Sequence, residues 1–154
     1  AVKHLAHKEF VKDVESSYQE SWQAKHWRAI GSAYKNSPYF EHFENEIAHF
    51  YSGKFDLLLD FNLQQLELLL KILRIKKNIT RSEHYEKEAV SFLDLREKIH
   101  PKIDFITDKH TLETLSKPYY QTFETKFEFI PNLSILDLLF NKGLETVNYL
   151  GVDL

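Results

Sequence analysis

The sequence contains no cysteine, which excludes disulfides, thiolate metal sites and cysteine nucleophiles, and fits a reducing compartment. Its glycine count is 4, too few for the glycine-rich loops that surround bound phosphate groups. Basic residues are not in excess either, since 20 Lys and Arg stand against 23 Asp and Glu, for a formal net charge of -3. This balance argues against nucleic acid as the main partner.

Long hydrophobic runs are also missing. The most apolar stretch, Phe55–Leu73, is interrupted by acidic, amide and basic side chains, and it falls short of the roughly 20 mostly apolar residues that cross a membrane. The segment Ala1–Phe10 has three charged residues and two histidines, without the apolar centre of a secretory signal. We therefore expect a soluble, cytoplasmic protein with no membrane span.

The overall composition is typical of a globular protein, with 43% hydrophobic and 28% charged residues. A length of 154 residues is enough for one domain with a substantial core, so we expect a single domain over residues 1–154. Aromatic residues make up 14% of the chain, which a well-filled core explains better than a surface that stacks sugars or bases.

Apolar residues at helical spacing predict helices over Glu20–Tyr34 and within Phe55–Leu73, the second one with a candidate restart near Asp60–Asn62. Between them, Ser37-Pro38 is typical of an N-cap followed by the first helical residue. This pair predicts a further helix that begins there and extends to about Tyr51.

A fourth helix is predicted over Ser134–Asn141, with a short continuation over Glu145–Leu150. Ser134 follows a Pro-Asn turn and precedes an apolar run, as an N-cap does, and Asp137 occupies the position from which an acid reaches back to the first turn. Gly143 can end this helix in a left-handed conformation.

Strand signals are weaker. Alternation over Phe10–Glu15 predicts a short strand, Ile79–Ser82 is a second candidate, and Tyr119–Phe129 favours strand or coil. A short helix is predicted over Asp94–Ile99 and a loop over Lys102–Lys117. The sequence therefore predicts a predominantly helical α+β fold, in which several packed helices accompany a small sheet of short strands.

The segment Phe129–Gly143, which reads FIPNLSILDLLFNKG, resembles the C-terminal signature of the WbqC-like proteins, a family of bacterial surface-polysaccharide gene clusters. Further resemblance is found at Trp22–Ile30, Ala33–Glu41, Asp60–Asn62, Asp94–Arg96, His100–Lys102 and Tyr119–Phe123. Two departures stand out. Family members usually begin with an additional strand-rich region that this chain does not show, and Leu144 stands where the family often has proline.

The resemblance implies a role in surface-polysaccharide biosynthesis of the O-antigen type. Our hypothesis is a transferase that moves an acyl or aminoacyl group to a nucleotide-linked sugar. The alternative is a non-catalytic binding or scaffold protein of the same pathway, so the assignment as an enzyme stays open. The sequence indicates no particular cofactor.

Within this hypothesis, the candidate site combines histidines as general bases with side chains that hold anions and sugar hydroxyls. The turn at residues 26–28 offers an imidazole, an indole and a guanidinium, although core packing and solvent exposure would explain these residues equally well. The predicted catalytic residues are His26 and His100, and the predicted substrate-binding residues are Arg28, Tyr34, Arg96, Tyr120, Gln121 and Asn141.

A third hypothesis is a metalloprotein. His42, Glu46 and His49 fall at i, i+4 and i+7, and therefore on one helix face, where they could ligate zinc or iron. The pattern echoes one half of a di-metal carboxylate motif, but no second copy occurs in the sequence. A solvated polar face is the commoner explanation, and the predicted site contains no metal ligand.

Overall fold

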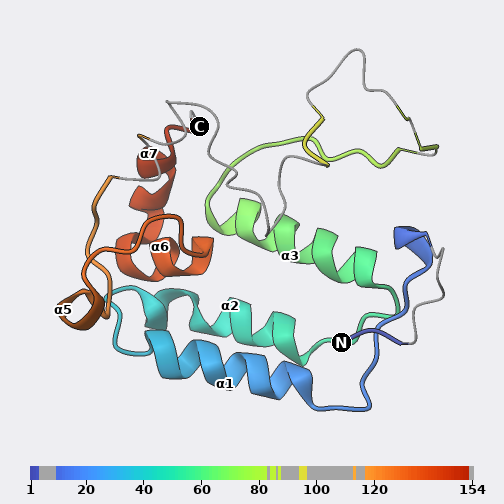
Figure 1. Cartoon of the computed structure of the whole chain (residues 1–154), viewed down its shortest axis with the longest axis horizontal. Helices are drawn as coiled ribbons and strands as arrows, with labels where there is room; N and C mark the ends of the chain where they lie inside the picture. Colours follow the sequence, from blue (N-terminus) through green and yellow to red (C-terminus); the bar gives the residue numbers. More distant parts are fainter. Residues whose placement is uncertain are drawn as a thin grey trace.

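The computed structural model describes residues 1–3, 10–82, 84, 85, 87, 94–96, 113 and 117–152, and it is predominantly helical (Figure 1). The helix α1 (Trp22–Tyr34) pairs with α2 (Phe40–Ser52), and α3 (Leu58–Ile72) follows. The remaining elements are 3-10 helix η1 (Val11–Asp13), α5 (Glu124–Phe127), α6 (Ile135–Lys142), 3-10 helix η2 (Gly143–Glu145) and α7 (Thr146–Leu150). None of the helices in these ranges is long and apolar enough to cross a membrane.

The four helices expected from the sequence are present. The predictions for α1, for the end of α2 and for α6 with its continuation are confirmed to within two residues. The third helix begins only at Leu58, because the residues before it bond to the N-terminal segment instead. Leu58 donates its backbone N–H to Val14 at 2.9 Å, and Ser16 donates to Asp56 at 2.8 Å.

The N-cap prediction for Ser37 was wrong. The helix α2 begins at Phe40, and Ser37 donates its hydroxyl to the carbonyl of Tyr34, at the end of α1. A serine hydroxyl can either donate to the last carbonyls of one helix or accept from the first amides of the next. In this turn it closes α1, and Ser37 is buried.

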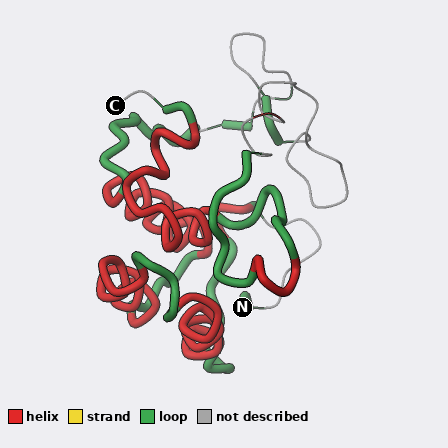
Figure 2. The backbone as a smooth tube through the Cα atoms, turned by 90° about the vertical axis from the view of Figure 1, so that its left-hand side faces the viewer, coloured by secondary structure: helices red, strands yellow, loops and turns green. Residues whose placement is uncertain are grey.

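The prediction of a small sheet is not supported. In the described part of the chain only isolated bridges form, Val2 with Ser16 and Glu15 with Leu57 (Figure 2). The expected strand Phe10–Glu15 contains η1, and its Phe10 and Val11 are 69% and 65% exposed, so the alternation buries no apolar face. Residues 79–82 are loop.

Two further expectations concern the later part of the chain. Residues 119–129 adopt coil around the short helix α5, which is the coil alternative expected from the sequence. The helix predicted over residues 94–99 and the loop predicted over residues 102–117 lie largely outside the described residues.

The core lies where α6 packs against the start of α2. Leu139 and Phe140 are fully buried, and the Phe140 ring lies 5.0 Å from Phe40 and 5.2 Å from Tyr34, measured between centroids. Trp27 of α1 stacks on the other side of Phe40 at 6.1 Å. Aromatic side chains therefore do fill the core, since burying each one removes a large apolar area from water.

Gly143 follows the last residue of α6 and takes a backbone conformation with positive φ. Its φ of 58° is confirmed as positive, although its ψ of -136° differs from that of a left-handed helical residue. An added Cβ would lie 2.8 Å from Cδ1 of the Tyr39 ring. The same tyrosine donates its backbone N–H to the carbonyl of Phe140 at 2.9 Å, so the turn between α1 and α2 is seated directly on the end of α6.

We expect Gly143→Ala to lower the free energy of unfolding by about 2–4 kcal/mol, because it combines backbone strain with overpacking against Tyr39. Urea unfolding followed by circular dichroism measures the change. Two variants separate the causes. Gly151→Ala carries only the positive-φ strain, since its Cβ meets no atom within 4 Å, and should lose about 1 kcal/mol.

Gly31→Ala, in the interior of α1 with open space around it, should be neutral or stabilising by up to about 1 kcal/mol. A Gly143→Ala loss no larger than that of Gly151→Ala would contradict the close packing with Tyr39.

Candidate functional site

Of the predicted residues of α1, His26 and Arg28 lie on its solvent side, whereas Tyr34 packs against the core. His26 is exposed, and its ring lies edge-on to Trp22, with 5.3 Å between centroids, and to Tyr51, with 6.3 Å. Arg28 is exposed two residues further along. Trp27 packs into the core, as the core-packing alternative expected.

Two of the predicted sugar-binding amides are used within the fold. Gln121 is buried, donates to the carbonyl of Ile130 at 2.7 Å and accepts its N–H at 2.9 Å, which closes the loop between them. Asn141 is also buried, donates to the carbonyl of Asp137 at 2.8 Å and accepts from the Thr122 hydroxyl at 3.1 Å. Gln121 thus closes the loop at 121–130, and Asn141 joins that loop to α6 through Thr122.

The first turn of α6 carries both expected capping residues, Ser134 and Asp137. Ser134 caps α6 as expected, because its hydroxyl accepts from the backbone N–H of Leu136. Asp137, expected to reach back to the first turn, instead accepts a hydrogen bond of 2.6 Å from the hydroxyl of Tyr119. Its carboxylate is buried, so this bond replaces the water that the charge would otherwise need.

Tyr34 lies beside this carboxylate and is half-buried. Burial, with a further contribution from Asp137, raises the pKa of Tyr34 to about 12. The pKa of Tyr119 is also raised, by burial first and then by its hydrogen bond to Asp137. A high pKa keeps a phenol protonated, so both tyrosines act as donors here rather than as bases.

The other predicted residues are dispersed. Arg96 binds the Asp94 carboxylate, with Nε 2.9 Å from Oδ1, and its guanidinium lies 4.9 Å from the centroid of the Tyr85 ring. Tyr120 is 52% exposed. His100 lies outside the described residues. The roles predicted for these residues stay predictions.

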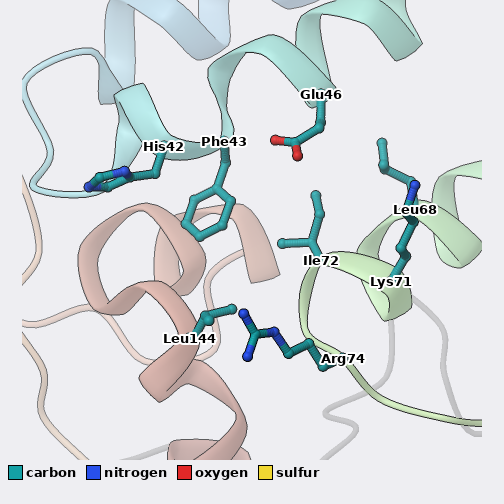
Figure 3. Close-up of a pocket in the computed structure, with 8 residues that line it drawn as sticks. All are labelled: His42, Phe43, Glu46, Leu68, Lys71, Ile72, Arg74 and Leu144. Carbon is teal, nitrogen blue, oxygen red and sulfur yellow. The ribbon is translucent and has the colours of Figure 1, made fainter.

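A hollow of about 250 Å³ lies between α2, the end of α3 and η2, and the predicted site residues do not line it (Figure 3). Its apolar walls include Phe43, Ile72 and Leu144. Its polar groups are His42 and Glu46 from α2, and Lys71 and Arg74 from the end of α3. The sequence interpretation had considered the first two as metal ligands and had assigned Lys71 and Arg74 to no site.

The four polar side chains of the hollow are exposed, and they form no hydrogen bond or ion pair with the described residues. His49, the third member of the expected metal face, does not line the hollow. The described residues contain no group of three or more His, Asp or Glu placed to hold a metal ion, so His42, Glu46 and His49 do not form the expected metal site.

Comparison with known families identifies the chain's relatives. The model of the WbqC-like protein family matches residues 1–149, nearly the whole chain. The chain belongs to the WbqC-like protein family. No curated protein and no solved structure gives a significant match. The resemblance noted in the sequence is thereby confirmed, and the hollow of this WbqC-like protein lies within the matched region.

We expect Tyr119→Phe to lower the free energy of unfolding by about 1–3 kcal/mol, because it leaves the buried Asp137 carboxylate without its hydroxyl donor. Chemical denaturation measures the loss. Tyr120→Phe is the matched control, because it removes the hydroxyl of an exposed tyrosine at the neighbouring position. It should change stability by less than about 0.5 kcal/mol. Equal effects of the two substitutions would contradict the role of the hydrogen bond.

The raised pKa of Tyr34 has a consequence at alkaline pH. An unfolded tyrosine ionises near pH 10, whereas Tyr34 in the folded protein keeps its proton until about pH 12. Its contribution to stability is therefore complete below about pH 10 and is lost as the pH rises towards 12. Urea midpoints should fall less steeply in Tyr34→Phe than in the wild type over this range; parallel curves would refute this.

Proposed function

We propose that this WbqC-like protein is a cytoplasmic enzyme of bacterial surface-polysaccharide assembly, which transfers an acyl or aminoacyl group to a nucleotide-linked sugar. Family membership supports the pathway. The observation that carries the proposal is the hollow between α2 and α3, because it places apolar walls beside charged groups that have no partner among the described residues. Such a combination of contact area and orienting polar groups is typical of small-molecule sites.

The size of the hollow sets which part of the ligand it can hold. At about 250 Å³ it is smaller than the roughly 300–1,000 Å³ of sites that enclose a whole drug-sized ligand. The sugar and its phosphates would occupy the hollow, while the nucleoside extends over the open surface. Lys71 and Arg74 are suited to phosphate oxygens, Lys71 as a point charge and Arg74 as a planar fork.

The reaction we propose uses a thioester as acyl donor. An amine or hydroxyl of the sugar bonds to the carbonyl carbon, the carbon–sulfur bond breaks, and the proton lost by the acceptor ends on the released thiol. Within the hollow, His42 and Glu46 are the groups able to accept that proton during transfer. The acceptor would have to lie within hydrogen-bond reach of one of them.

A scaffold function is the second candidate, and an exposed apolar patch favours it. Phe123 and Phe127 on and beside α5 are 42% and 64% exposed, and Ile130 and Leu133 are 42% and 41% exposed. Exposed apolar residues gathered on one segment are typical of protein–protein contacts. Replacing Phe127 with Ser should abolish partner binding under this hypothesis and leave transfer unchanged under the first.

We expect a nucleotide sugar to raise the melting temperature of the protein. At 100 times its dissociation constant, a ligand that binds only the folded state adds about 2.7 kcal/mol, or roughly 5–10 °C for a chain of this length. A mixture of acetyl-CoA with the stabilising sugar should then yield an acylated sugar by mass spectrometry. The proposal fails if no nucleotide sugar shifts the melting temperature and no acylated product forms.

A further inference from the structure

Opposite charges lie at two sides of the hollow. Glu46 comes from α2, whereas Arg74 comes from the end of α3. Figure 3 shows Phe43 and Ile72 between the carboxylate of Glu46 and the guanidinium of Arg74, while the Lys71 side chain points away from Arg74. A ligand in this hollow therefore meets an acid at one side, a guanidinium at the other and apolar walls between them.

These charges do not neutralise one another. Glu46 forms no ion pair with Lys71 or Arg74, although all three line one hollow. Elsewhere the same chain does pair such groups, as in Arg81 with Asp60 at 2.9 Å. Unpaired groups of opposite sign at two sides of one hollow are suited to a ligand that carries both signs.

Arg74 is held in place by an unusual helix end. After α3, the N–H of Ile75 donates to the carbonyl of Leu70 at 2.9 Å, and the N–H of Arg74 donates to Lys71 at 3.1 Å. This is the bond pattern of a Schellman motif, whose left-handed position is usually occupied by glycine. Arg74 occupies it with a φ of 58°.

A non-glycine residue in this conformation is strained, and such strain is often found at functional sites. The backbone of the motif would be at least as well satisfied by glycine, so the motif itself does not explain the arginine. The Arg74 guanidinium lines the hollow, which gives the arginine a use there that glycine could not supply (Figure 3).

We infer that the hollow recognises a nucleotide-linked amino sugar, with Glu46 binding the free amine and with Arg74 binding the phosphates. The inference rests on the proposed function and names its substrate class. The opposite charges orient the ligand, because the Glu46 carboxylate repels phosphate and the Arg74 guanidinium repels the ammonium. To react, the ammonium first gives one proton through Glu46 to solvent, and the neutral amine then attacks the thioester, its second proton ending on the released thiol. The amide formed is neutral, so the product loses its attraction to Glu46 and is released more readily.

Isothermal titration calorimetry with three matched probes tests the inference. UDP-glucosamine should bind the wild type about tenfold more tightly than UDP-glucose or UDP-N-acetylglucosamine, the effect expected from one charge-assisted hydrogen bond. Glu46→Gln should remove this preference. Glu41→Gln is the matched control, because Glu41 is an exposed acid of α2 that does not line the hollow.

The variant Arg74→Gly distinguishes a loss of ligand affinity from a loss of protein stability. It should weaken all three probes at least about tenfold, because the phosphates lose their anchor. Its melting temperature should stay level or rise, since glycine suits the left-handed position. Lys54→Ala, which removes an exposed cation outside the hollow, should bind like the wild type.

The inference is overturned if the wild type binds all three probes equally, if Glu46→Gln keeps the preference for the amine, or if Arg74→Gly binds normally. Any of these results, combined with acyl transfer to a nucleotide sugar by the wild type, would leave the proposed function standing with its site elsewhere. Absence of both binding and transfer would reject the function as well.

Discussion

The contact between Tyr39 and the end of α6 is the constraint on which the rest of the structure depends. One hydrogen bond, from the N–H of Tyr39 to the carbonyl of Phe140, and one close approach, of the Tyr39 ring to Gly143, seat the α1–α2 turn on α6. Because α2 begins directly after this contact, Phe40 enters the core, and Phe43, one turn later, reaches the hollow. Leu144 reaches the same hollow because it follows Gly143.

The hollow is therefore built by two helix ends that each depart from ordinary helical geometry. At the end of α6, a glycine with positive φ allows the backbone to approach an aromatic ring. At the end of α3, an arginine takes the position that glycine usually occupies and directs a charge to the rim. The glycine serves packing and the arginine serves the proposed binding, so the same backbone requirement is met by opposite residue choices.

The sequence predicted most of the helices and little of the site, for physical reasons. Helical spacing and the Ser134 cap are local signals, and they located α1 and α6. Ser37 was misassigned because its hydroxyl can serve either of two adjoining helices, and only packing decides between them. The bond from Tyr119 to Asp137 joins residues far apart in the chain, which no local pattern indicates.

The sequence shows that His42 and Glu46 share one helix face. It does not show that Lys71 and Arg74 line the same hollow, because the approach of α2 to the end of α3 is a tertiary contact that no local pattern indicates. One signal was available in the sequence. Arg74 stands after the last residues of the predicted helix, at the position where a helix usually ends with glycine.

The most direct measurement is a crystal structure with UDP-glucosamine bound. We expect the sugar amine within hydrogen-bond distance of Glu46 and the phosphates at Arg74, with the nucleoside over the open surface. A nucleotide sugar bound instead beside His26 and Arg28 on α1 would contradict the account. It would show that the site is formed by residues that the sequence predicted.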